Sequence, residues 1–142
     1  MNERQSSTGT PSETPEVRRI DDVAAVDCPC GAARRVFSRG DGGPLGIHRV
    51  TISRNAKRHY HKHTTEYYII IEGSGEIELN DERIAVSAGD IVYIPPYTRH
   101  AARGRLEIMN VVYPPFDPTD EYLDEDGGEM ESYAPDRRVS GR

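Results

Sequence analysis

The central part of the chain is a succession of short β-type segments separated by turn residues, and this pattern limits the possible folds most. Segments rich in Val, Ile and Tyr alternate with clusters of Gly, Pro, Asn and Asp, which is typical of an all-β domain. Between these turns no segment keeps the period of an amphipathic helix for about ten residues. The expected strands are 34–38, 46–53, 56–61, 66–71, 75–79, 83–87, 90–95, 99–103 and 105–113.

Strands this close together leave no room for the helices that a doubly wound fold places between successive strands. Asn80 and Asp81 tolerate positive φ, so they favour a tight hairpin between 75–79 and 83–87. Nine short antiparallel strands within about 80 residues predict a small antiparallel β-barrel or jelly roll.

The 142 residues suit one domain with tails. Residues 1–16 contain almost no apolar side chain, so we expect a disordered N-terminal tail there. Residues 17–116 hold most of the apolar side chains and are expected to form the barrel. Residues 117–142 form an acidic C-terminal tail, which we expect to be solvated, although Tyr122 and Leu123 could instead dock on the barrel or on a neighbour.

Charge and hydropathy exclude several classes of function. A net charge of -6 argues against a general binder of nucleic acids or anionic membranes. The longest apolar run, 67–71, is too short to cross a bilayer, and the N-terminal residues lack the pattern of a secretory signal. We therefore expect a cytoplasmic protein.

Cys28 and Cys30 are the two cysteines of the chain, and a single proline separates them. A disulfide between them would be strained, and two thiols without further ligands make a poor zinc site. The spacing therefore favours structural or surface cysteines.

Three of the five histidines, His59, His61 and His63, stand at alternate positions, and Glu66 follows them before an apolar strand. Alternate side chains of a strand share a face, so His59 and His61 point the same way. If this strand forms a hairpin with the next one, Glu66 faces His61 across it. Neutral imidazole and carboxylate groups bind divalent transition metals at about 2.0 to 2.2 Å. The segment therefore predicts a metal site.

An alternative is that these histidines form a solvated basic patch with their neighbours Lys57, Arg58 and Lys62. The glutamate and the apolar strand that follow favour the metal site instead. His63 falls in the expected turn, so we expect it to point outward or to lie at the rim of a pocket. A ligand set of His61, His63 and Glu66 remains a second possibility, but it leaves only two residues before the glutamate.

Residues 88–103 supply a fourth ligand candidate. They indicate a turn at Gly89, a strand to Ile94, a proline turn and a further strand that begins at His100. A single histidine of this kind is more often part of a core. A fourth ligand must come from the opposite wall of the barrel, which favours His100.

These two segments resemble the two sequence motifs of the cupin superfamily. The first motif runs Gly, five residues, His-x-His, three or four residues, Glu, six residues, Gly. Here His59, His61, Glu66 and Gly73 match it, and Ser53 stands in place of the opening glycine.

The second cupin motif runs Gly, five residues, Pro-x-Gly, two residues, His, three residues, Asn. Gly89, Pro95 and His100 match it, while Tyr97 replaces the second glycine and Gly104 the asparagine. These departures affect turn residues and leave the ligand positions intact.

The resemblance, which covers about residues 45–113, implies that His59, His61, Glu66 and His100 bind one divalent transition metal, namely Fe, Mn, Ni, Zn, Co or Cu. Four protein ligands would leave coordination positions open for a substrate or O₂.

A metal-dependent enzyme of the dioxygenase type or of the sugar or keto-acid isomerase type follows from this resemblance. A non-catalytic module that binds a metal and a small molecule such as a sugar is the main alternative, and a vestigial site is a third. Small cupins tend to pair through their edge strands, so we also expect a homodimer.

Several further residues are candidates for the pocket. Tyr68 and Ile70 share the face of Glu66 and are expected to line the barrel interior. Tyr93 could reach the pocket as a catalytic residue or pack in the core.

Alternation in the strand 46–53 turns either His48 or Arg49 into the cavity. An inward Arg49 would favour an anionic substrate, and an inward His48 would be a candidate proton carrier. The pattern alone does not choose between them.

Overall fold

The computed structural model describes residues 14–124, and the expected tail residues 1–13 and 125–142 lie outside this range. The described strands are β1 (Val26–Cys28), β2 (Gly31–Phe37), β3 (Gly46–Ile52), β4 (His59–Tyr60), β5 (Thr65–Leu79), β6 (Glu82–Ser87), β7 (Ile91–Ile94), β8 (His100–Tyr113) and β9 (Tyr122–Leu123). Short 3₁₀ helices are η1 (Ile20–Asp22), η2 (Arg39–Asp41) and η3 (Pro118–Asp120). None of the helices in this part of the chain has the length and hydrophobicity that crossing a membrane requires.

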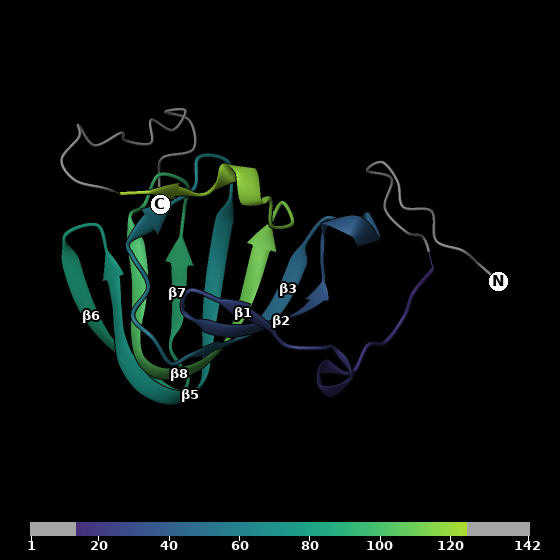
Figure 1. Ribbon diagram of the computed structural model, residues 1–142, viewed down its shortest axis with the longest axis horizontal. Coiled ribbons are helices and arrows are strands. Elements are labelled where there is room, and N and C mark those ends of the chain that lie inside the picture. The colour runs from purple at the N-terminus through teal and green to yellow at the C-terminus, as the bar shows by residue number, and fades with distance from the viewer. Residues whose placement is uncertain (1–13, 125–142) are drawn as a thin grey trace.

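Two long antiparallel strands, β5 and β8, organise the molecule. They pair along nearly their whole length, with Thr65 opposite Tyr113 and Leu79 opposite His100. In one half of the fold, β3, β2 and β1 extend the sheet in that order from β8, and β7 pairs with β5. In the other half, β6 pairs with β5, and β4 followed by β9 extends the sheet from β8. Because β5 and β8 belong to both halves and curl together, the sheet closes on itself (Figure 1). The predicted small antiparallel jelly roll is therefore confirmed.

Glycines allow β5 and β8 to bend without a break. Gly73 and Gly104 have φ angles of 91° and 104°, in the region that favours glycine. A Cβ atom on Gly73 would lie 2.1 Å from the carbonyl oxygen of Arg105, and one on Gly104 would lie 2.8 Å from the Cα atom of Gly75. The expectation of separate strands on either side of these glycines was wrong, because each pair of expected strands is one bent strand.

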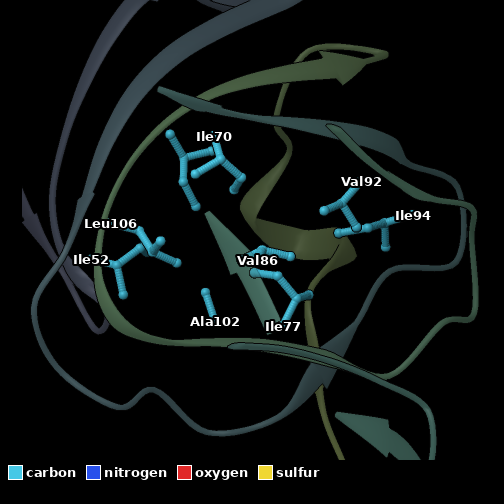
Figure 2. Close-up of a cluster of buried hydrophobic side chains, with 9 residues drawn as sticks. Ile52, Ile70, Ile77, Val86, Val92, Ile94, Ala102 and Leu106 are labelled. Carbon is cyan, nitrogen blue, oxygen red and sulfur yellow. The ribbon is translucent and has the colours of Figure 1, made fainter. Parts of the chain in front are cut away.

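The hydrophobic core fills the part of the barrel next to these bends. Its buried side chains come from β5 and β8 and from β3, β6 and β7. They face one another across the interior (Figure 2). They are Ile52, Ile70, Ile77, Val86, Val92, Ile94, Ala102, Leu106 and Ile108. The buried polar side chains His61, Glu66, His100 and Asn110 do not belong to this cluster.

Residues 117–124 pack on the barrel, so they do not form a solvated tail. Strand β9 pairs with β4, with Tyr122 opposite Tyr60. The rings of these two tyrosines stack with their centroids 5.4 Å apart, and the amide of Asp124 donates to the carbonyl oxygen of Arg58 at 3.1 Å. The docking of Tyr122 and Leu123 on the barrel is the alternative that the structure supports.

Candidate metal centre

Two imidazoles and a carboxylate meet inside the barrel. Nε2 of His100 lies 3.1 Å from Oε1 of Glu66, and Nδ1 of His61 lies 3.7 Å from the same oxygen. All three side chains are buried. One donor atom from each of them lies within 4.8 Å of the others, so this cluster could hold a metal ion.

The pairing of β4 brings the histidines together, and it differs from the hairpin expected between 56–61 and 66–71. Strand β4 pairs with β8 and β9, which sets His59 opposite His100. The backbone amide of Tyr97 donates to the carbonyl oxygen of His61 at 2.7 Å. His61 therefore reaches Glu66 from the loop that follows β4 and not across a ladder.

His59, the fourth expected ligand, lies beside this cluster. Its ring centroid is 4.3 Å from that of His100 and 5.3 Å from that of His61. Its Nδ1 faces the carbonyl oxygen of Lys57 at 3.3 Å, and its Nε2 lies 4.0 Å from Oε2 of Glu121. The cluster of converging donor atoms contains three of the four expected ligands, and the ring of the fourth is in contact with them.

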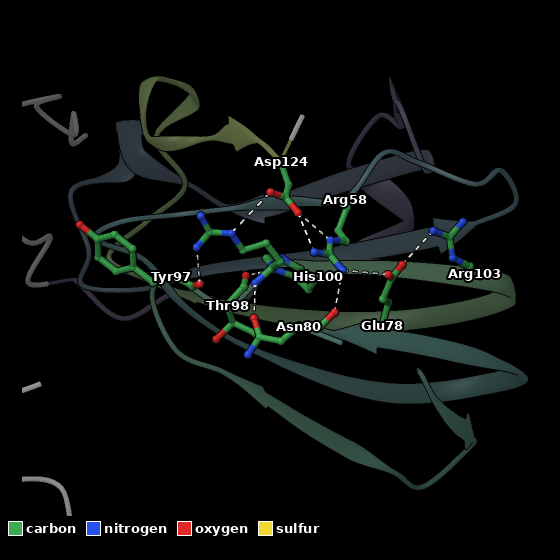
Figure 3. A network of polar contacts seen from close by, with 9 residues as sticks. Arg58, Glu78, Asn80, Tyr97, Thr98, His100, Arg103 and Asp124 are labelled. Atoms are coloured by element: carbon green, nitrogen blue, oxygen red, sulfur yellow. Dashed lines mark hydrogen bonds and ion pairs between the residues drawn. The ribbon is translucent and has the colours of Figure 1, made fainter. Parts of the chain in front are cut away.

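The hydrogen bonds of His100 determine which of its nitrogens is available. Nδ1 lies 2.8 Å from the carbonyl oxygen of Thr98, so it carries the proton and donates it (Figure 3). Nε2, the other ring nitrogen, faces the carboxylate of Glu66 at 3.1 Å. A proton or a cation between Nε2 and the carboxylate oxygen favours so close an approach. The donor set therefore fits a metal ion.

The protonation states also suit metal binding. Burial raises the pKa of Glu66, but contacts with His100, His61 and Asn110 outweigh it and hold the pKa well below its usual range. Burial lowers the pKa of His59 to about 3 and also lowers that of His61. At neutral pH the carboxylate is charged and these imidazoles are neutral, as ligation requires.

Asn110 is part of the site although sequence reasoning did not identify it. Its Nδ2 donates to Oε2 of Glu66 at 2.9 Å. Its Oδ1 is buried and has no hydrogen-bond partner among the described residues. Asn110 interrupts the alternating inward residues Leu106, Ile108 and Val112 of β8. This polar residue in an apolar inner row was the signal that could have identified it.

A cavity of about 580 Å³ opens beside the cluster. His59, His61 and Glu66 line it together with apolar side chains of β2, β3 and β8. Tyr68 lines this cavity as expected, whereas Ile70 faces the interior but belongs to the hydrophobic core.

In β3, His48 and not Arg49 faces the cavity. His48 is 5% exposed, and its Nε2 has no hydrogen-bond partner in the described part of the chain. Burial lowers the pKa of His48 to about 4. Arg49 lies outside the cavity and donates from Nε to Glu107 at 3.1 Å, so its assignment to the substrate pocket was wrong.

Tyr93 is also an outer-face residue. Its side chain is 44% exposed, and its ring packs against Tyr67 with the centroids 5.2 Å apart. Tyr93 is not among the residues that line the cavity, so the structure does not support a catalytic role for it there. His63 is exposed, as its place in a turn predicted.

A buried carboxylate holds the loop between His61 and Glu66. Asp120 accepts hydrogen bonds from the backbone amides of Lys62 and His63 at 2.9 and 3.0 Å and from Oγ1 of Thr64 at 2.8 Å. Asp120 follows the barrel in sequence, in η3, and its role was not apparent from the acidic composition of that segment.

Ion pairs fix the residues that precede His59. Arg58 donates to Asp124 at 2.8 Å and to Glu78 at 3.1 Å, and Glu78 also accepts from Arg103 at 2.9 Å (Figure 3). This network joins β4 to the end of β9 and to the second half of β5.

Comparison with known proteins supports the resemblance to cupins at the level of sequence. A family model for the cupin domain matches residues 47–110. The chain is 31% identical over 124 residues to L-ectoine synthase of Halomonas elongata, which covers 84% of this chain and 88% of that protein. It is 41% identical over 66 residues to the uncharacterized protein MJ1618 of Methanocaldococcus jannaschii. That second match covers 42% of this chain and 53% of MJ1618, about half its length.

Solved structures show the same fold. A protein from Planctomyces limnophilus matches with a TM-score of 0.75 and 34% identity over 78% of this chain and 98% of that one. Pac13, a nucleoside dehydratase of Streptomyces, matches with a TM-score of 0.69 and 21% identity over 78% and 91% of the two chains, a likeness that shows the fold alone. Taken with the barrel and its inward histidines, these matches establish that the chain belongs to the cupin superfamily.

Proposed function

We propose that this protein is an enzyme that binds one divalent transition metal through His59, His61, Glu66 and His100 and acts on a small molecule in the adjacent cavity. The observation that carries the proposal is the convergence of His61, Glu66 and His100, whose donor atoms lie within 4.8 Å of one another inside the barrel. Fe, Mn, Ni, Zn, Co and Cu all accept such a donor set. A bound ion would supply Lewis acidity at a substrate oxygen.

The residues beside the cluster can orient a substrate and hold its protons. His48, Asn110 and Tyr68 lie in one row across β3, β8 and β5 and all line the cavity. Burial raises the pKa of Tyr68 well above its ordinary value, so its hydroxyl keeps its proton and can donate a hydrogen bond to a substrate. His48 is neutral at pH 7, and the free Oδ1 of Asn110 accepts an N–H or O–H group.

A donor and two acceptors beside a Lewis acid suit proton transfer within a substrate, which is the isomerase type of chemistry. The similarity to L-ectoine synthase also favours chemistry of this kind over a dioxygenase.

In the experiment, the protein is loaded with each metal in turn and mixed with sugars, keto acids or polyphenols. Products are followed by NMR, and O₂ uptake is followed with an electrode. We expect conversion of a carbonyl compound without O₂ uptake, lost in Glu66→Gln and retained in His63→Gln. O₂ uptake that depends on a substrate would instead assign a dioxygenase. A compound that raises the melting temperature but is recovered unchanged would assign the binding module.

A further inference from the structure

The sulfur atoms of Cys28 and Cys30 face each other at a distance of 2.8 Å. Cys28 ends β1 and Cys30 lies in the turn that joins β1 to β2, and both residues line the same cavity as the histidines. The sequence predicted structural or surface cysteines, but the structure presents a pair of adjacent thiols at a cavity wall.

The backbone of this turn holds the two sulfurs together. The carbonyl oxygen of Cys30 accepts from the amides of Ser53 and Arg54 at 2.8 and 3.1 Å. Nη2 of Arg54 donates to the carbonyl oxygens of Cys28 and Gly31 at 3.0 and 2.9 Å. The ring of the intervening proline further restricts the backbone. The proximity of the sulfurs is thus set by the fold of the turn.

The surroundings of Cys30 disfavour its thiolate. Burial raises the pKa of Cys30 to about 12, and the contact with Cys28 adds to this effect. Cys30 therefore keeps its proton at neutral pH and can donate it toward the sulfur of Cys28. A thiolate is the species that attacks a disulfide, so the raised pKa makes Cys30 a slow attacking group.

We propose that Cys28 and Cys30 are a redox-active pair that is oxidised to an intraturn disulfide by a low-molecular-weight disulfide such as oxidised glutathione. In the first exchange the Cys28 sulfur attacks the reagent, forms a mixed disulfide and releases one glutathione. In the second exchange the Cys30 sulfur loses its proton to solvent, attacks the Cys28 sulfur and displaces the second glutathione. The two cysteine thiols are oxidised, and the disulfide of the reagent is reduced to two thiols.

Two features of the structure determine how easily this pair is oxidised and reduced. The sulfurs are already in contact, so the second exchange is intramolecular and needs little motion. Only one residue separates the cysteines, so the bridge is strained and returns readily to the dithiol. The inference concerns the turn alone and does not depend on the proposed metal or reaction.

The experiment treats the full-length, chelator-washed protein with oxidised glutathione at pH 8 and follows free thiols and intact mass. Because the chain has no other cysteine, every change in thiol count belongs to this pair. We expect both thiols to disappear together, with a mass loss of two hydrogens and no persistent glutathione adduct. Dithiothreitol should restore both thiols.

Variants with one cysteine replaced separate the first nucleophile from the second. Comparison of their melting temperatures with that of the wild type checks that they are folded. Cys30→Ser should accumulate one stable glutathione adduct at Cys28, whereas Cys28→Ser should react much more slowly. A wild-type protein that keeps both thiols, retains a glutathione adduct or forms disulfide-linked dimers would overturn the proposal. Equal reaction of the two single variants would overturn the assignment of Cys28 as the first nucleophile.

Discussion

At the scale of single residues, His48 shows how burial and cavity chemistry are linked. The side chain is almost fully buried, and burial, helped by the charge of Arg35, lowers its pKa from 6.5 to about 4. Between these two values the unfolded chain binds a proton at this residue and the folded chain does not. Proton uptake therefore favours unfolding, and stability falls as the pH decreases through this window.

We predict that His48→Gln reduces this pH dependence. In urea unfolding at pH 7.5 and pH 5 with a chelator present, the loss of stability between the two pH values should be smaller in the variant by at most about 2 kcal/mol. His59 and His61 contribute to the loss in the same direction, so the variant keeps part of it. An unchanged difference between the two pH values would show that folding does not lower the pKa of His48.

At the scale of elements, the loop from β4 to β5 depends on Asp120 in η3. The carboxylate accepts from two backbone amides and one hydroxyl between His61 and Glu66. A local segment that follows the barrel in sequence thus positions two of the proposed ligands. Its acidic composition favoured a solvated tail over docking on the barrel, because composition does not reveal which distant amides a carboxylate meets.

We predict that Asp120→Asn destabilises the protein by about 1 to 3 kcal/mol, because an amide cannot accept all three bonds with the strength of a carboxylate. It should also weaken metal binding, measured by calorimetry. Asp81→Asn is the matched control, since Asp81 is exposed in a hairpin turn. Equal stability of the two variants would contradict the role of Asp120.

A second prediction at this scale compares Gly104, at the bend of β8, with Gly89, in the turn between β6 and β7. Gly89→Ala introduces only backbone strain, because its φ is 99° and no atom lies within 4 Å of the added Cβ. It should cost about 1 to 2 kcal/mol. Gly104→Ala adds a clash with the Cα atom of Gly75 at 2.8 Å and should cost more. Denaturant unfolding would contradict this account if the two variants were equally stable.

At the scale of the whole molecule, period-two alternation and turn residues predicted the all-β barrel and the Asn80–Asp81 hairpin. The inward faces of Glu66 and Tyr68 also followed from alternation. The partner of β4 did not, because a strand of two residues has too little pattern to specify its pairing. Continuous β5 and β8 were missed because a glycine at a bend has the same local signal as a glycine in a turn.

The homodimer stays a prediction, and it belongs to this scale. We expect light scattering to give twice the mass of the chain at micromolar concentration, because edge strands of small barrels tend to pair. A mass equal to that of one chain over the whole concentration range would contradict it.

The most direct test of the central proposal is the metal content of the purified protein, determined by elemental analysis of wild type, His61→Ala, Glu66→Gln and the matched exposed control His63→Ala. The proposal predicts one transition-metal ion per chain in the wild type and in His63→Ala, and loss of that ion in the other two variants while circular dichroism shows the same fold. A wild-type protein that retains no stoichiometric metal after supply with each candidate ion, or a Glu66→Gln variant that binds it unchanged, would contradict the proposed centre.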